Sequence, residues 1–217
     1  MAGVQPRSEQ AYATRAALID AARALFVEKG YHRTGTEEIV AAAGVGTRGA
    51  LYHHFADKRA LFLAVFEAVE EDLVGSAAAG VLPGDAFGQL RAGLLAFLDA
   101  SLTPEVQRVL LLDGPAVLGW RTWRSLEEKY GLGAIQSLLG QAVEEGAVRR
   151  QPLGALAHLL LAVIDEAALF VVHAVDPAAA RAEAATAVDG LLAGIRTDPT
   201  PPPSRSPAKG GRRRTVR

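Results

Sequence analysis

The residues best suited to chemistry lie in one short stretch, residues 45–58, which reads VGTRGALYHHFADK. Thr47 follows a glycine and precedes a helical spacing of apolar residues, so it suits a helix N-cap whose hydroxyl accepts a backbone N–H. Leu51 and Phe55 are four residues apart and share one face of that helix, which we expect to be buried. So short a helix with one apolar face suits the major groove of DNA.

The remaining arc of this helix carries groups that favour DNA contact: Arg48, Gly49, Tyr52 and His53. Arginine donates to both O6 and N7 of guanine, and Tyr, His and Thr side chains donate to phosphate oxygens. Gly49 costs a helix about 1 kcal/mol relative to alanine, but it lets the backbone approach another surface closely. The pattern therefore predicts a helix that reads base edges.

Neighbouring helices must position this one. Residues 36–43 are Ala-rich with two acids in the first turn, where the helix dipole favours them, and Gly44 can end the helix in the left-handed conformation. Residues 14–29 predict a longer helix that Gly30 ends, and Asp57 suits the N-cap of the helix that follows. The small core expected for this helix-turn-helix module consists of Leu18, Ile19, Phe26, Ile39, Val40, Leu51 and Phe55.

Taken in register, roughly residues 12–66 resemble the N-terminal domain of the tetracycline-repressor (TetR) family. The matching positions are Gly30, Tyr31, Thr34, Ile39, Ala43, Gly44, Val45, Thr47, Arg48, Gly49, Leu51, Tyr52, His54, Phe55, Lys58 and Leu61. The resemblance implies a homodimeric, ligand-responsive transcription regulator that binds double-stranded operator DNA with one helix-turn-helix per subunit. The sequence departs from the family at Gly35, where Ser or Thr usually caps the second helix.

Carried over position by position, the resemblance assigns base contacts to the arc named above and phosphate contacts to Tyr52, Lys58, Thr34 and Thr47. The full DNA-contacting set that we expect is Thr34, Thr36, Thr47, Arg48, Gly49, Tyr52, His53 and Lys58. In the simpler interpretation, Tyr52 and His54 only pack against the first helix, and Lys58 is a solvated surface charge.

Composition places these groups in a chain whose charge is unevenly distributed. The 217 residues include no cysteine, which excludes disulfides, thiolate zinc sites and thiol chemistry, and no pattern requires a metal or a cofactor. The net charge is −1, yet residues 1–59 carry eight Lys/Arg and six Asp/Glu, residues 60–198 nine and eighteen, and residues 199–217 six and none. A mildly basic N-terminal end beside an acidic body fits a protein that contacts DNA only through that end, twice over in a dimer.

Beyond residue 57 the pattern is helical, so the predicted fold class is all-α. We expect a helix-turn-helix domain at 12–59, a helical effector-binding and dimerisation domain at 60–198, and a disordered basic Pro-rich tail at 199–217. That tail suits either non-specific DNA affinity or mere solubility. Helices are expected at about 57–75, from 87, from Pro104, over 117–145 with a bend near 131–133, and over 152–175 and 177–195, with breaks at 77–84 and a turn at 113–115.

The segment at 152–175 is apolar almost all round, which predicts burial on more than one side and hence a homodimer. Charges interrupt each apolar run, so we expect no membrane span, and residues 1–13 lack the apolar segment of a secretory signal. These observations predict a cytoplasmic protein.

A small-molecule effector is expected in the helical body, because an apolar interior with a few polar groups suits a ligand pocket. The candidates are Asp113, Trp120, Trp123, His158, Asp165, Glu166 and His173. Each also has a plainer interpretation, as a core aromatic, a hydrogen-bonded core histidine, a solvated charge or a pair across the dimer.

The function predicted is a DNA-binding regulator, in the first instance a repressor, whose operator affinity falls when the effector binds. An enzyme using His158, Asp165, Glu166 or His173 as acid and base is the first alternative, but no nucleophile elbow, zinc motif or phosphate loop accompanies them. A helical protein that sequesters a ligand and no longer reads DNA is the second.

Overall fold

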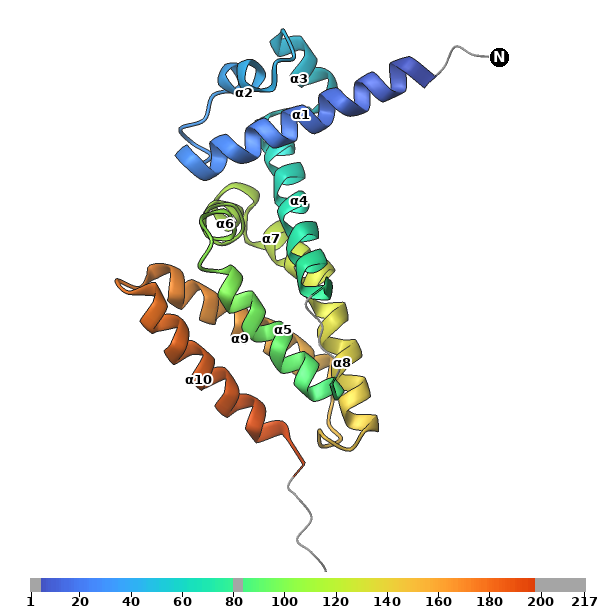
Figure 1. Cartoon of the computed structure of the whole chain (residues 1–217), viewed down its shortest axis with the longest axis vertical. Helices are drawn as coiled ribbons and strands as arrows, with labels where there is room; N and C mark the ends of the chain where they lie inside the picture. The colour runs from blue at the N-terminus through green and yellow to red at the C-terminus, as the bar shows by residue number, and fades with distance from the viewer. Residues whose placement is uncertain (1–4, 80–83, 198–217) are drawn as a thin grey trace, which may run out of the picture.

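The computed structural model describes residues 5–79 and 84–197, and within these ranges the regular structure is helical apart from one isolated bridge between Val148 and Arg196. The fold is therefore all-α, as predicted. Three helices at the N-terminal end form a compact module, and the fourth runs from it into a larger helical body (Figure 1). The tail at 199–217 and part of the expected break at 77–84 lie outside the described residues.

The N-terminal module consists of α1 (Gln5–Lys29), α2 (Thr36–Ala43) and α3 (Arg48–His54). Helix α1 begins nine residues before the start predicted from its apolar stripe, because the stripe marks only the part that packs on the other helices. Gly30 and Gly44 end α1 and α2 with φ values of +78° and +68°, as expected. The predicted core is confirmed: its members are buried, except Ile19, which packs against the core from its edge.

Helix α4 (Lys58–Ala79) links this module to the body. Asp57 caps it as predicted, with its Oδ1 accepting from Ala60 N at 2.7 Å. The helix continues past the predicted end at Gly75. Leu61, Phe62 and Phe66 are fully buried, and the apolar core runs without interruption from the module into the body.

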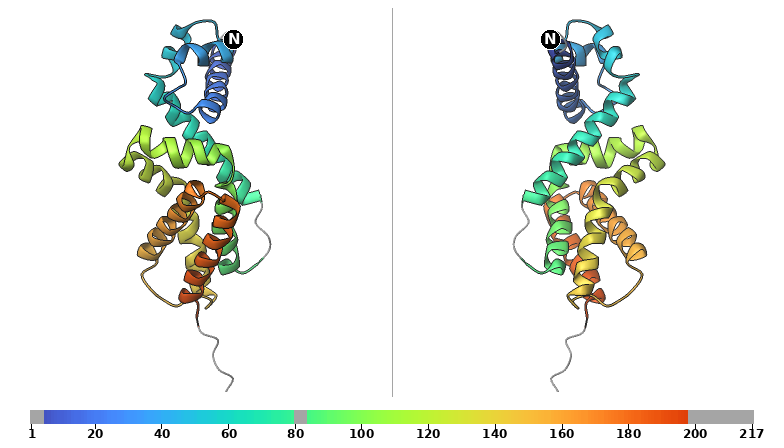
Figure 2. Two further views of the ribbon diagram at one scale, coloured as in Figure 1. Left: turned by 90° about the vertical axis from the view of Figure 1, so that its left-hand side faces the viewer. Right: turned by 90° about the vertical axis from the view of Figure 1, so that its right-hand side faces the viewer.

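The body contains α5 (Ala86–Ala100), α6 (Gly114–Leu118), α7 (Trp120–Glu127), α8 (Gly133–Glu144), α9 (Leu153–His173) and α10 (Pro177–Ile195), with wider π-helical segments η1 (Val106–Asp113) and η2 (Glu128–Leu132). Helix α9 packs against α5, α8 and α10, while η1, α6 and η2 contact α4. The module and the far ends of α5, α8 and α10 lie at opposite ends of an elongated molecule (Figure 2).

The turn predicted at 113–115 is wrong, because the chain stays helical through it. Pro115 lies at the start of α6, where the wide turns of η1 give way to an ordinary α-helix. In a π-helix the backbone N–H of residue 115 would donate to Leu110 O, but proline has no backbone N–H. The Trp123 indole Nε1 donates to that oxygen instead, at 3.0 Å. The chain breaks at Gly119, with φ +79° and ψ 149°, and the bend expected near 131–133 coincides with η2.

Helix α9 contradicts the expectation that interrupting charges leave no apolar run long enough to span a membrane. Within residues 5–79 and 84–197 it is the one helix long and apolar enough to cross a membrane. Asp165 and Glu166 are adjacent and so interrupt its apolar sequence at a single point. Core helices of globular proteins pass the same test, and α9 packs on three other helices of the body.

The conformation of Gly30 gives a stability prediction. An alanine there would adopt φ +78° and bring its Cβ within 2.9 Å of Arg108 Nη2, so Gly30→Ala should lower the free energy of unfolding by about 1–2 kcal/mol. Gly75→Ala is the matched control, since it lies within α4 with no atom within 4 Å of the added Cβ, and it should stabilise by about 0.5–1 kcal/mol. Urea denaturation measures both; shifts of the same sign would contradict the assigned backbone.

Candidate functional site

The inward face of α3 fixes how the outward face is presented. Leu51 is fully buried and Phe55 nearly so, as predicted. Thr47 lies at the N-cap with φ −142° and ψ 151°, but its hydroxyl makes no capping hydrogen bond, which corrects the expected role. The first turn is instead closed by Ala50 N donating to Thr47 O at 3.0 Å. The Thr47 hydroxyl is consequently exposed at the end of the helix.

The outward face of α3 exposes the predicted arc. Gly49 and His53 are exposed, and Tyr52 is 45% exposed. Arg48 Nη2 donates to the Tyr52 hydroxyl at 3.4 Å, with its guanidinium carbon 5.8 Å from the ring centre. Hydrogen bonds first from Arg48 and then from Thr36 lower the pKa of the Tyr52 phenol. Arg48 and Tyr52 therefore form a preformed pair of donors on the surface.

Glu37, which the sequence analysis did not single out, restrains this pair. Its Oε1 accepts from Arg48 Nη1 at 3.0 Å, and both side chains are more than half exposed. Both residues line a shallow hollow of about 450 Å³ between α2 and α3. The acid in the first turn of α2 was visible in the sequence, but only the angle between the helices brings it to Arg48.

Two expected phosphate contacts are corrected by the structure. Thr34 is 2% exposed and its hydroxyl donates to Gly30 O at 2.9 Å. Lys58 Nζ donates to Tyr31 O at 2.8 Å and to Thr34 O at 3.0 Å, and burial lowers the pKa of its ammonium. Both side chains therefore hold the loop between α1 and α2. Thr36, at the start of α2, is half-buried, and so is His54, at the end of α3.

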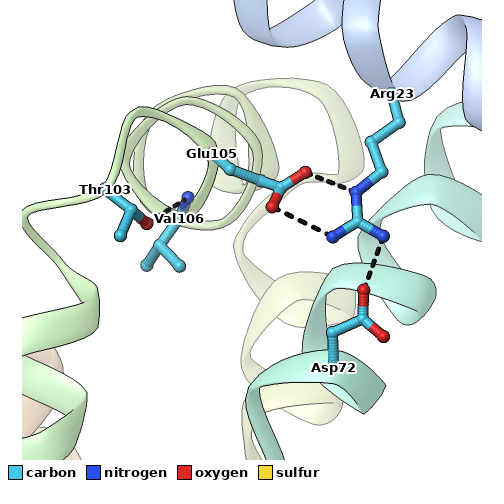
Figure 3. Close-up of polar contacts among 5 residues, drawn as sticks. All are labelled: Arg23, Asp72, Thr103, Glu105 and Val106. Carbon is cyan, nitrogen blue, oxygen red and sulfur yellow. Dashed lines mark hydrogen bonds and ion pairs between the residues drawn. The ribbon is translucent and has the colours of Figure 1, made fainter. Parts of the chain in front are cut away.

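The module is attached to the body through Arg23 on α1 (Figure 3). Its guanidinium donates to both oxygens of Glu105, with Nη2 2.9 Å from Oε2, and Nη1 lies 2.6 Å from Asp72 Oδ2 on α4. These carboxylates raise the pKa of the Arg23 guanidinium beyond its ordinary value, with the Glu105 bond the largest cause. The residue after Glu105, Val106, donates its backbone N–H to the Thr103 hydroxyl at 3.4 Å, which ties down the backbone beside Glu105 (Figure 3).

Other polar contacts join module and body beside this bridge. Asp113 Oδ2 accepts from the backbone N–H of Tyr31 at 2.8 Å. Arg59 donates to Val117 O at 3.1 Å and to Leu118 O at 2.8 Å. Asp113 is therefore a structural link between module and body, and its ligand-lining role stays a prediction.

The remaining predicted ligand residues do not converge. Trp123 is 1% exposed within the core, whereas Trp120 is 64% exposed and packs on it at a ring distance of 4.9 Å. His158, Glu166 and His173 are exposed on α9, and His173 Nδ1 contacts Leu169 O at 2.8 Å. Of the seven candidates, Asp165 is the one in a buried polar site of the body.

Asp165 meets two further acids, Glu70 of α4 and Glu127 of α7, in what we term the carboxyl cluster. The three residues are 3–4% exposed. Arg124 Nη1 donates to Asp165 Oδ2 at 2.5 Å. Burial raises the pKa of Glu70 to about 7 and that of Asp165 to about 6, while burial and then repulsion by Glu70 raise the pKa of Glu127 well above its usual value. Glu70 interrupts the apolar stripe of α4 four residues after Phe66, a signal that was available in the sequence.

Comparison with protein families agrees with this architecture. Residues 18–65 match the model described as "Bacterial regulatory proteins, tetR family", and residues 87–195 match the "Tetracyclin repressor-like, C-terminal domain". The first match covers the N-terminal module and is to a family of bacterial regulatory proteins, and the second match covers half of the chain. The chain belongs to the TetR family of regulatory proteins.

Individual relatives fit the same family. The chain is 37% identical over 105 residues to the HTH-type transcriptional regulator AcrR of Shigella flexneri, a match that spans 48% of each protein. A TetR-family transcriptional regulator from Pectobacterium atrosepticum superposes with a TM-score of 0.78 at 33% identity, covering 88% of this chain and 98% of that one. RolR, solved with resorcinol, shares the fold with a TM-score of 0.67 at 23% identity, covering 87% of this chain and 90% of RolR.

The carboxyl cluster gives a pH-dependent stability prediction. Because the pKa of Glu70 rises from 4.5 to about 7 on folding, the folded state holds more protons between these values. The free energy of unfolding should therefore fall as pH rises through this window, by up to about 1.4 kcal/mol per pH unit for each carboxyl. Glu70→Gln should make the fall shallower and stabilise the protein at pH 8, whereas Glu71→Gln, an exposed neighbour, should not. Denaturation curves of each variant at pH 5 and pH 8 measure this pH dependence. If the free energy of unfolding of Glu70→Gln changes with pH as much as that of the wild type, the prediction is refuted.

Proposed function

We propose that this protein is a homodimeric transcriptional repressor that binds a palindromic DNA operator through α3 and releases it when a small molecule binds in the body. The observation that carries the proposal is the geometry of α3. Its inner face is buried while Arg48, Tyr52 and His53 face outward on a helix short enough for the major groove. The division of roles between residues 12–59 and residues 60–198, and a cytoplasmic location, belong to the same proposal.

Within this proposal, Arg48 reads base edges. On binding DNA, Arg48 leaves the Glu37 carboxylate and donates to a guanine instead. This exchange costs little, because an exposed ion pair such as Arg48–Glu37 contributes little to stability in water. A Cβ at Gly49 would meet only Thr47 Oγ1, at 3.6 Å, so this position leaves open space for a base or sugar. The hydroxyls of Thr36, Thr47 and Tyr52 donate to phosphates. Lys58 and Thr34 act indirectly, by fixing the loop before α2.

The exposed apolar side chains of α9 and α10 support a dimer with a second copy of this chain. Leu159 and Phe170 of α9 are 63% and 52% exposed, and Leu191 of α10 is 53% exposed. Helices α9 and α10 lie side by side, so their exposed side chains can form one extended apolar surface. Such a dimer presents two copies of α3 to half-sites about 34–36 Å apart.

Effector control follows from the links between module and body. A ligand that favours a different packing of α4 would move the spacing of the two α3 helices away from that of the half-sites, and so weaken operator binding. The enzyme alternative is disfavoured by position. His158, Glu166 and His173 are exposed on α9, whereas Asp165 faces the core, so these acid–base candidates share no site.

The base-reading role of Arg48 predicts a specific loss. Arg48→Ala should weaken binding to a specific operator by about 1–3 kcal/mol and relax base preference at the contacted position. Arg150→Ala, an exposed arginine before α9, serves as the matched control and should change affinity by much less. Electrophoretic mobility shifts with the promoter region next to the gene measure both variants. Unchanged specific binding by Arg48→Ala would count against the assignment.

The dimer surface predicts a change of mass. Phe170→Glu places a charge on the exposed face of α9 and should convert the dimer into a folded monomer, with weaker operator binding. Leu102→Glu, on a 39% exposed residue after α5, should leave the dimer intact. Sedimentation equilibrium combined with circular dichroism separates dissociation from unfolding. A wild-type protein of monomeric mass would overturn this part of the proposal.

A further inference from the structure

The carboxyl cluster is an unusual feature for the interior of a helical body. It brings Glu70, Glu127 and Asp165 together from α4, α7 and α9, with one cation, Arg124, hydrogen-bonded to Asp165. One oxygen of each carboxyl is buried without a hydrogen-bond donor: Glu70 Oε1, Glu127 Oε1 and Asp165 Oδ1. Glu70 and Glu127 also hydrogen-bond each other through their side chains, so one of these two carboxyls carries a proton, and the unpaired oxygens lie on three different helices.

Such an arrangement is costly unless donors arrive. Burying a polar group without a partner is unfavourable, and a carboxylate is worse than a neutral group. Well-packed apolar residues of similar volume are often as stable as a buried ionic group, or more so. Buried ionisable groups whose pKa values are displaced in this way are concentrated at functional sites. The cluster is therefore better suited to binding than to stability.

We propose that the carboxyl cluster recognises an organic cation with N–H donors, such as an amidine or a primary amine, and that this cation is the effector of the regulator proposed above. The inference rests on the proposed function for its regulatory meaning. The chemistry of the cluster selects the ligand: when the carboxyls are ionised their charge exceeds that of the one guanidinium, so their oxygens favour a cation that takes the place of their protons. Among the described residues, no group of three or more acidic, His or Cys side chains is arranged to hold a metal ion. N–H donors on a planar cation match the open oxygens.

The position of Glu70 connects this site to the DNA-binding module. Asp72, two residues further along α4, contacts Arg23 of α1 at 2.6 Å. A cation that draws Glu70 toward Glu127 and Asp165 moves α4 relative to α7 and α9, and with it one of the two carboxylates that hold Arg23 (Figure 3). Occupancy of the cluster and the orientation of α1 are thereby coupled through a single helix.

Protons compete with the cation for the same oxygens. The charged and titratable side chains around the cluster are Arg124, Glu128 and His158, with Glu128 3.6 Å from Arg124 and 3.7 Å from His158. Since burial raises the pKa of Glu70 to about 7 and that of Asp165 to about 6, part of the cluster is protonated near neutral pH. Cation binding then releases protons and strengthens as pH rises from 6 to 8.

Titration calorimetry on the full-length protein with benzamidinium tests the inference. Benzamide is the neutral analogue with N–H donors, and benzyltrimethylammonium is a cation without them. Benzamidinium should bind more tightly at pH 8 than at pH 6 and release protons, and the other two probes should bind at least about tenfold more weakly. Glu70→Gln and Glu127→Gln should each weaken benzamidinium binding about tenfold or more. Glu71→Gln, exposed on the same helix, should not.

Absence of benzamidinium binding at millimolar concentration, equal binding of benzamide, or unchanged affinity in both Gln variants would overturn the inference. Circular dichroism of each variant confirms that it is folded. Operator binding measured in parallel without probe separates the two claims. Intact operator binding without a benzamidinium site refutes the cation effector alone, whereas loss of specific DNA binding by the wild-type protein refutes the proposed function.

Discussion

The attachment of α1 to the body is the constraint on which the rest of the structure depends. Arg23 holds carboxylates from two different segments, Glu105 and Asp72, and the Tyr31 N–H is held by Asp113. Partial burial of Arg23, with its side chain 25% exposed, makes these pairs less subject to screening than fully exposed ones. Because the apolar core is also continuous from module to body, the direction of α3 is set by the body as a whole.

The fixed attachment of the module to the body explains how one short helix can contact base edges in a defined orientation. Helix α3 buries Leu51 and the adjacent Phe55 in the module, so the orientation of its outer face follows that of α1 and α4. The loop before α2 is fixed by Lys58 and Thr34. A change in the body is therefore transmitted as movement of the whole module, and the carboxyl cluster on α4 is placed where such a change can begin.

Local patterns in the sequence predicted much of the fold. Residues 36–43 and 177–195 form helices with the expected bounds, since Gly44 and Pro177 act through their own backbone. Prediction failed where a distant group decides the outcome. Pro115 does not end its helix because Trp123 satisfies the freed carbonyl, and Thr34 faces inward because Gly30 O accepts its hydroxyl. The buried roles of Glu70 and Glu127 likewise depend on the packing of α4 against the body, which no single helix reveals.

In vitro selection of binding sites from random-sequence DNA tests the central claim most directly. Two rigidly held copies of α3, related by symmetry, should enrich an inverted repeat whose half-sites are separated by one helical turn of DNA, about 10–10.5 base pairs, or a multiple of it. Enrichment of an isolated, asymmetric motif, or of no motif at all, would contradict the account.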